Sequence, residues 1–321
     1  MKQVQAENIM LMLKKNKLIF FISAFTLMLC ISAARTEDRE LYIEQTLVVK
    51  SKNDFALFTN KDRIEIEGDL IIEASSLYDL TGFSNVERIF GNLIIKNNPL
   101  LKEVSHFTQL VEVEGDIIIE NNDSLKQVKS FPVLERVESV SVINNKTLSE
   151  FAFSNNVNTI TNSLMISENP ELNKISGLNK IQIIMSDFSI ISNKTLSSVD
   201  FLNSLELLNG SLIVKNNAKL NKISFNKLKS IGANLIIENN SALSHALLNN
   251  LQTIGTLTAS AKLRIKNNPH LQTVKLNTLE PLNNVEVSTP NNPKLSKNSV
   301  KKLMNLTPEH MKYLDEIDNI K

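Results

Sequence analysis

The sequence is poor in the residues that most folded domains use for crosslinks, tight turns or large aromatic cores. Its 321 residues include one cysteine, no tryptophan, three tyrosines, eight glycines and eight prolines. A single cysteine excludes an internal disulfide framework. The apolar fraction of 42% is therefore largely aliphatic, which favours a stack of thin aliphatic layers over one large globular core.

A surplus of either charge is also absent. Lys plus Arg number 35 and Asp plus Glu number 34, and the two signs are interspersed along the chain. A polyphosphate ligand requires a basic field, so nucleic acid is excluded as an expected partner.

The only long apolar run lies near the N-terminus, from Leu18 to Ile31, and contains the single cysteine, Cys30. Three lysines precede the run and three small residues, ending at Ala34, follow it. This pattern is typical of a secretory signal peptide, and the run is shorter than the roughly 20 residues of a membrane-spanning helix. We expect cleavage after Ala34 and a secreted mature chain without cysteine or a membrane-spanning segment.

One repeat dominates the rest of the chain. Its pattern is Gly-x-Leu-x-Ile-x-Asn-Asn-x-x-Leu, as in the segments that begin at Gly91 and Gly115. The second asparagine recurs in phase, at intervals of 23 to 24 residues with one of 28, at Asn98, Asn122, Asn145, Asn169, Asn193, Asn217, Asn240, Asn268 and Asn292. Ser75 and Lys52 take its place in two earlier, degenerate copies. The sequence thus predicts about eleven coils of roughly 24 residues.

Each repeat predicts one short strand. The residues five and three positions before the asparagine are apolar and rich in Val and Ile, so alternate side chains face inward. A turn follows the asparagine, often with proline as at Pro99, and an inward leucine comes next. The predicted fold is a mainly β, parallel, leucine-rich-repeat-like solenoid. The asparagine amides form a structural ladder that pairs with the backbone of their own and the next coil.

These repeats resemble the receptor L domain, found in the extracellular halves of insulin-receptor and EGF-receptor relatives, and also repeats of glycosylated fungal cell-wall proteins. The resemblance covers about residues 45–295. It implies a right-handed solenoid and a role in extracellular recognition. The chain departs from the animal receptors because it has no cysteine-rich module and no kinase domain, so signalling by this chain alone is not expected. It also lacks the Ser/Thr-rich stalk and hydrophobic tail of the cell-wall proteins.

The expected domain order is a signal peptide at 1–34, a linker at 35–44, the solenoid at 45–295 and a helical cap at 296–321. The middle repeats break the pattern, with Ser141, Met165 and Ser189 on the outer face. This break indicates either a junction of two L-like halves near 140–190 or a local binding patch in one continuous solenoid. The single 28-residue interval indicates a protruding loop at 255–261.

The outward position between the two inward strand residues is often aliphatic. We define the strip as Val48, Ile71, Ile94, Ile118, Ile213 and Ile236. The next outward position alternates between lysine and glutamate, from Lys50 and Glu73 onward, which predicts cross-strand pairs that set the register of the coils. An aliphatic row beside such a charge row is unusual on a free surface, so the strip is the candidate partner-binding site.

Six Asn-x-Ser/Thr sequons occur, as expected of a secreted glycoprotein. Three of them use ladder asparagines, which we expect to be buried. The candidate glycosylation sites are Asn209, Asn239 and Asn305.

Parallel β-helices also include polysaccharide-cleaving enzymes, which need paired carboxylates on adjacent coils. The nearest candidates, Asp69 and Asp116, are expected to be turn residues, and the four histidines have no metal-ligand spacing. We expect no enzyme activity, cofactor or metal.

Two hypotheses therefore lead. The first is a secreted recognition protein that binds an extracellular protein or peptide; the second is a structural or adhesive cell-surface protein that self-associates. A polysaccharide-active enzyme is a remote alternative.

Overall fold

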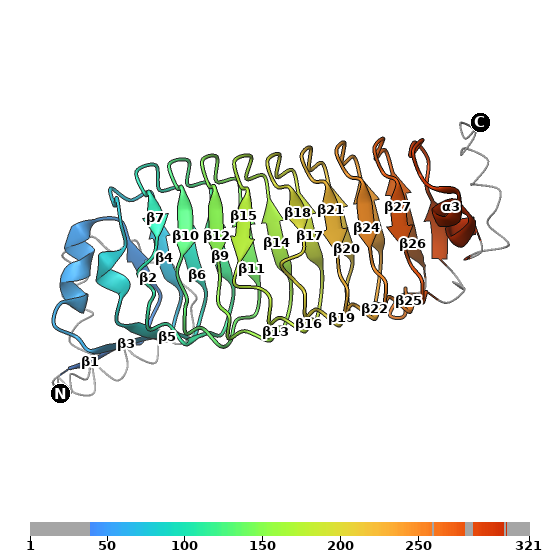
Figure 1. Ribbon diagram of the computed structural model, residues 1–321. Helices are drawn as coiled ribbons and strands as arrows, with labels where there is room; N and C mark the ends of the chain where they lie inside the picture. Colours follow the sequence, from blue (N-terminus) through green and yellow to red (C-terminus); the bar gives the residue numbers. More distant parts are fainter. Residues whose placement is uncertain (1–38, 259, 280–284, 305, 307–321) are drawn as a thin grey trace. The chain divides into compact units, whose positions relative to one another are not determined.

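The computed structural model describes residues 39–258, 260–279, 285–304 and 306. The predicted signal peptide, Asn305 and the cap beyond residue 306 lie outside the described residues. The described chain makes about ten turns of a parallel β-solenoid, which Figure 1 shows as a stack of similar coils. The predicted fold class is thus confirmed.

The main sheet receives one strand from every coil, and all its neighbouring strands are parallel. Its order along the stack is β2 (Leu47–Val49), β4 (Leu70–Glu73), β6 (Leu93–Lys96), β9 (Ile117–Glu120), β11 (Val140–Ile143), β14 (Leu164–Ser167), β17 (Phe188–Ile191), β20 (Leu212–Lys215), β23 (Leu235–Glu238), β26 (Ala261–Lys266) and β28 (Val285–Ser288). The sheet runs unbroken through the middle repeats, so a junction of two halves does not interrupt it.

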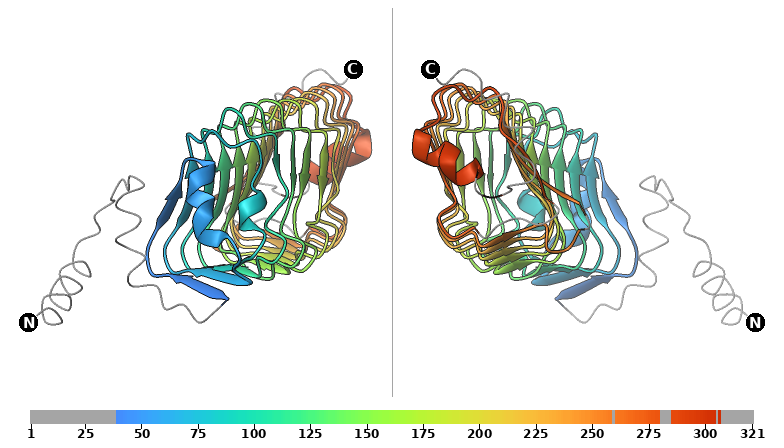
Figure 2. Two further views of the ribbon diagram at one scale, coloured as in Figure 1. Left: turned by 90° about the vertical axis from the view of Figure 1, so that its left-hand side faces the viewer. Right: turned by 90° about the vertical axis from the view of Figure 1, so that its right-hand side faces the viewer.

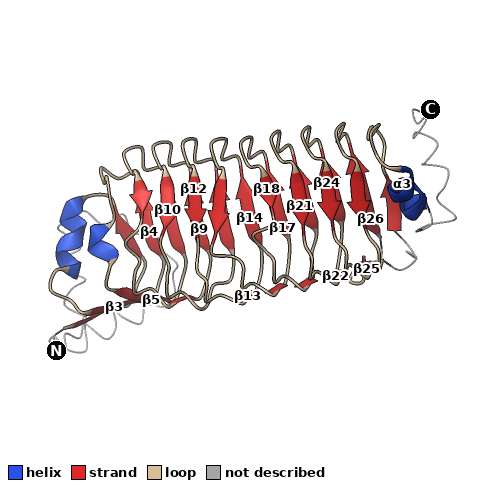
Figure 3. Cartoon of the chain, in the orientation of Figure 1, coloured by secondary structure: helices blue, strands red, loops and turns tan. Residues whose placement is uncertain are grey.

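Four smaller sheets form the remaining sides of the coils, drawn as red strands in Figure 3. One side has β1 (Glu40–Ile43), β3 (Arg63–Ile66), β5 (Val86–Ile89) and β8 (Glu112–Val113), then β13 (Thr159–Ile160), β16 (Ile183–Ile184), β19 (Leu207–Leu208), β22 (Ser230–Ile231) and β25 (Thr253–Ile254). The other has β7 (Glu103–Val104), β10 (Gln127–Lys129), β12 (Glu150–Ala152) and β15 (Lys174–Ser176), then β18 (Ser198–Val199), β21 (Lys222–Ser224), β24 (His245–Leu247) and β27 (Thr273–Lys275). These side sheets, unlike the main sheet, are each interrupted midway.

The core is a column of inward side chains. In β6, Leu93 and Ile95 are fully buried while Ile94 between them faces outward, as the alternation of a strand requires. Viewed from either end, successive coils lie one behind another (Figure 2). Close stacking explains the repeat glycine, because a Cβ on Gly91 would lie 2.7 Å from the carbonyl of Gly68 in the coil below.

A column of phenylalanines fills part of this core. Phe83, Phe107 and Phe131 stack ring on ring at centroid distances of 5.4 and 5.7 Å, and Phe153 follows at 5.9 Å. One ring per coil at the same position gives the offset stacking that aromatic pairs prefer. The repeat pattern did not indicate that these rings touch.

The ladder asparagines from Asn98 to Asn268 are fully buried, and Asn292 is 7% exposed. The side-chain amide of Asn145 donates to the carbonyl of Ile119 at 3.0 Å and to Oδ1 of Asn169 at 3.2 Å. Its own Oδ1 accepts from the backbone N–H of Asn122 at 3.1 Å. Each amide therefore joins its coil to both neighbours. Ser75 begins the ladder, its hydroxyl donating to Asn98 Oδ1 at 2.6 Å.

The first asparagine of each Asn-Asn pair has a different role. It adopts a left-handed backbone conformation, with φ of 55° at Asn97 and 51° at Asn144, which asparagine tolerates better than most residues. Its amide also joins an outer row, because Asn144 Nδ2 donates to Asn121 Oδ1 at 2.6 Å. At this position three coils carry another residue: Ala74, with φ of 45°, Glu168, with φ of 57°, and Ser192, with φ of 59°.

Both ends of the stack are covered. At the N-terminal end a 3-10 helix, η2 (Lys52–Phe58), sets Phe55 and Phe58 against Phe83 at 5.0 and 5.3 Å, and a shorter one, η3 (Thr81–Phe83), follows. At the other end lies α3 (Lys297–Met304), where Ser299 Oγ accepts from the backbone N–H of Val274 at 3.1 Å. Helices at these positions protect the open edges of the sheets.

Two expectations at the N-terminal end need correction. The expected linker 35–44 includes β1, which pairs in parallel with β3. This segment joins the side sheet because the side chain of Leu41 is buried there. Lys52 does not occupy a ladder position. It is exposed at the start of η2, because the described residues contain no earlier coil that a buried amide could join.

Replacing Asn145 by alanine tests the ladder. The change leaves the buried N–H of Asn122 and the buried carbonyl of Ile119 without their partners, and each such loss costs about 1–3 kcal/mol. We expect the free energy of unfolding to fall by roughly 3 kcal/mol, measured by urea denaturation. The control is Asn203→Ala at an exposed turn, which should change stability by less than about 0.5 kcal/mol. Equal effects of the two changes would contradict the ladder's role.

Replacing Glu168 by asparagine tests the outer row. A left-handed backbone conformation is less favourable for glutamate than for asparagine. We therefore expect Glu168→Asn to stabilise the chain by about 1 kcal/mol. Glu171→Asn, three residues away and also exposed, is the matched change of charge. A melting temperature that rises equally in both variants would show that charge, not backbone conformation, is responsible.

Candidate binding surface

The outer face of the main sheet places the strip residues in register. Val48 pairs with Ile71, Ile71 with Ile94 and Ile94 with Ile118, and further along Ile213 pairs with Ile236. All six side chains are partly exposed. Between the two groups the same row carries Ser141, Met165 and Ser189, so the strip is divided by three strands rather than continuous.

The charge row lies beside the strip. Glu73 forms ion pairs with Lys50 at 3.6 Å and with Lys96 at 3.4 Å. Glu120 is in register with Lys96 but has no ion-pair partner among the described residues. Partly exposed pairs of this kind contribute little to stability, so their main effect is to favour one register of the coils.

At the C-terminal end of the row, three cations surround one carboxylate. Glu238, whose side chain is only 6% exposed, lies 3.1 Å from Lys215, 3.7 Å from Arg264 and 3.6 Å from Lys266. Positive charge is therefore in excess here. The first four strands carry the opposite excess, with Asp69, Glu73, Asp116 and Glu120 against Lys50 and Lys96. The charges are balanced over the whole chain but are separated along this face.

The centre of the face is uncharged in both rows. The row beside the strip continues there as Ile143, Ser167 and Ile191, so serines alternate with large apolar side chains across β11, β14 and β17. Ser167 and Ser189 are 6% and 3% exposed although they point outward. Larger neighbours therefore cover them, and the patch presents mainly Ile143, Met165 and Ile191 to solvent.

The carboxylates considered for catalysis serve the turns between coils. Oδ1 of Asp69 accepts from the backbone N–H of Asn92 at 2.7 Å and from its amide at 2.9 Å. Asn92 Oδ1 in turn accepts from the backbone N–H of Asp116 at 2.8 Å. Asp69 and Asp116 are thus separated by an intervening coil and belong to a short polar ladder. Among the described residues no cluster of His, Cys, Asp and Glu has the arrangement of a metal site.

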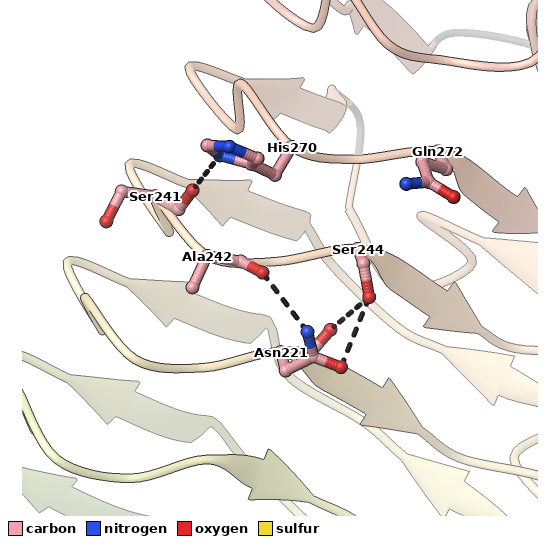
Figure 4. Close-up of a pocket in the computed structure, with 6 residues that line it drawn as sticks. All are labelled: Asn221, Ser241, Ala242, Ser244, His270 and Gln272. Atoms are coloured by element: carbon pink, nitrogen blue, oxygen red, sulfur yellow. Dashed lines mark hydrogen bonds between the residues drawn. The ribbon is translucent and has the colours of Figure 1, made fainter.

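A surface pocket lies near the C-terminal end of the stack, on the turns that follow the ladder (Figure 4). It is lined by Asn221, Ser241, Ala242, Ser244, His270 and Gln272. Several of its polar atoms bond within the pocket. His270 Nδ1 donates to the carbonyl of Ser241 at 2.8 Å, and Ser244 Oγ donates to Asn221 Oδ1 at 3.2 Å. These bonds hold neighbouring turns together, and the sequence pattern did not indicate the pocket.

The sequons differ in accessibility. Asn122, Asn145 and Asn193 are fully buried, as expected of ladder residues. Asn239 is exposed and Asn209 is partly exposed, and the amide of Asn209 lies 3.2 Å from Met185 Sδ. The predicted loop ends before Ala261, which is the first residue of β26. Leu257, in the described part of this loop, is 64% exposed.

The fold and this face define a parallel solenoid with a patterned, partly apolar sheet surface. A model of the receptor L domain matches residues 64–116 and 209–307, so these two segments of the chain are similar to the receptor L domain family. The unmatched residues between them include the coils with the uncharged central patch. No curated protein and no solved structure matches the chain.

Receptor L domains are extracellular domains that bind protein ligands, and the family is not a family of enzymes. Among the helices of the described residues, none has the length and apolar composition needed to span a bilayer.

The pH dependence of one ion-paired cluster can be predicted. Glu150 lies 2.8 Å from Lys129 and 2.6 Å from Lys174, and hydrogen bonds from these two lysines lower the pKa of Glu150 below its usual value of 4.5. A carboxylate with a lowered pKa stabilises the fold above its unfolded-state pKa and loses that contribution as the pH falls through its folded-state pKa.

We therefore expect wild type to melt above Glu150→Gln at neutral pH, with a difference that shrinks below about pH 4.5. Melting temperatures of both proteins between pH 7 and pH 3 test this. A difference that stays constant down to the lowest pH would contradict the lowered pKa.

Proposed function

We propose that this chain is a secreted recognition protein that binds an extracellular protein or peptide through the outer face of its main sheet. The observation that carries the proposal is the in-register aliphatic strip, partly exposed beside a charge row. Apolar side chains aligned over neighbouring strands provide the kind of contact area that protein interfaces bury at their centre. The flanking charges supply orientation and selectivity.

The family match supports this role, because receptor L domains bind protein ligands outside the cell. The proposal includes secretion directed by residues 1–34 and glycans at Asn209 and Asn239. The exposure of Asn239 and the partial exposure of Asn209 support these two acceptor sites. Both lie outside the apolar strip, so glycans there leave the strip residues on β4, β6 and β9 accessible.

The test is the double change Ile94→Lys and Ile118→Lys. Both side chains point outward and are partly exposed, so we expect the fold to persist, while two lysines in the strip introduce charges that a partner must desolvate. Affinity capture from the protein's natural extracellular medium, with identification by mass spectrometry, should show partners of wild type lost or weakened at least about tenfold, which equals 1.4 kcal/mol.

The matched control is Ile183→Lys. Ile183 is an outward, partly exposed isoleucine on β16 of a side sheet, so it carries the same chemical change to another face. Circular dichroism establishes that each variant is folded. Partners captured equally by all three proteins would place binding away from the main sheet.

A further inference from the structure

The outer face of the main sheet has a symmetry of charge about its central strand. β14 is sixth of the eleven strands, so every other strand has a counterpart at equal distance on the other side. Across this centre the charge row changes sign. Glu73 on β4 corresponds to Lys266 on β26, Lys96 to Glu238, and Glu120 to Lys215.

The strip, and one pair of residues at the start of the strands, follow the same symmetry. Ile94 corresponds to Ile236 and Ile118 to Ile213, an aliphatic residue to an aliphatic one. At the start of the strands Asp69 corresponds to Lys262, again with opposite charge. The counterpart of Ile71 is Arg264, whose aliphatic stem can cover an apolar side chain.

We propose that a second copy of this chain binds this face, with a two-fold axis parallel to the strands passing over β14. This names the partner of the face that the proposed function assigns, and so rests on that proposal. The rotation sets each strand of one copy against the counterpart strand of the other, β4 against β26 and β9 against β20. A two-fold interface must be self-complementary, and the antisymmetric charge row satisfies this condition.

The unbalanced charges of the single chain become balanced in this dimer. Glu120, which has no ion-pair partner among the described residues, meets Lys215 of the second copy. Lys266, one of three cations around Glu238, meets Glu73 of the second copy. The surplus positive charge at one end of the face is thus opposed by the surplus negative charge of the other.

The uncharged patch falls on the axis. Met165 and Ser167 on β14 meet their own equivalents, and Ile143 meets Ile191. This centre contains no charged side chain that would lose its hydration in the interface. Charged residues are usually scarce at the middle of a protein interface. The rows of four-residue strands cover roughly 50 Å by 13 Å, so the dimer buries on the order of 1,200 Å² in total, within the range of specific interfaces.

The other two-fold arrangement of two facing sheets is disfavoured. An axis along the stack sets every strand against itself and exchanges its two outward rows, which places Lys96 on Ile94 and Glu120 on Ile118. Charges would then be buried against aliphatic side chains.

Sedimentation equilibrium of the purified wild-type protein measures self-association. We expect a dimer for wild type and for the control Ile183→Lys, and an increase of at least tenfold in the dissociation constant for Met165→Lys, which sets two like charges on the axis. A wild-type protein that remains monomeric up to about 100 µM, in the weak range of specific association, overturns the proposal. So does a Met165→Lys variant that associates as tightly as wild type.

Crosslinking tests the orientation and does not depend on how the lysine variant folds. Single cysteines are introduced by Ile118→Cys, Ile213→Cys and Met165→Cys into the chain after residue 34, which has no cysteine of its own, and a short bismaleimide is added. We expect Met165→Cys to crosslink with itself, and Ile118→Cys to crosslink only when mixed with Ile213→Cys. Self-crosslinking of Ile118→Cys without a mixed product would show the axis along the stack and overturn the proposal.

The two proposals fail separately. A monomeric wild type whose captured partner is lost on Ile94→Lys/Ile118→Lys keeps the binding role of the face and assigns it to a different protein. If wild type forms a dimer with the expected crosslinks, and dimer formation prevents the capture of no other protein, then the second copy is the partner of this face.

Discussion

Close stacking of buried asparagines is the interaction on which the rest of the solenoid depends. Each ladder amide bonds to a neighbouring coil's backbone and to the next ladder amide, as Asn145 does with Ile119 and Asn169. A coil that slipped by one residue would leave these buried groups unpaired and turn its apolar residues outward. The ladder therefore holds all coils in one register, and the aliphatic and phenylalanine columns pack within that register.

Fixed register converts a repeated sequence into rows on a surface. A residue at one repeat position lies beside its equivalents in both neighbouring coils, so a preference for lysine or glutamate becomes an alternating row and a preference for isoleucine becomes a strip. The same regularity gives the face a centre at β14. The proposed binding role and the proposed dimer both depend on this arrangement, because outward residues that were not aligned in rows would form neither a strip nor a symmetric face.

Much of the structure could be predicted because the spacing of residues within the repeat indicates the geometry of each coil. The interval of the asparagines identified the coils, and the alternation of Leu93, Ile94 and Ile95 identified inward and outward residues. The departures occur where repetition ends or is replaced. Lys52 begins a 3-10 helix because the described residues provide no earlier coil for the ladder, and β1 pairs where a linker was expected because Leu41 can be buried on the side sheet. The left-handed conformation of Glu168 is imposed by its place in the turn, against its own preference.

The sequence by itself determined the fold class, the ladder and the membership of each row, because these depend on spacing along the chain. Only the tertiary structure decided which residues of different coils act together. The cluster of three cations around Glu238, the contacts between Phe83, Phe107 and Phe131, and the symmetry of the face about β14 arise from stacking. Stacking brings residues about 24 positions apart into contact. The strength of those contacts depends on distance and burial, and neither can be read from the spacing of the repeats.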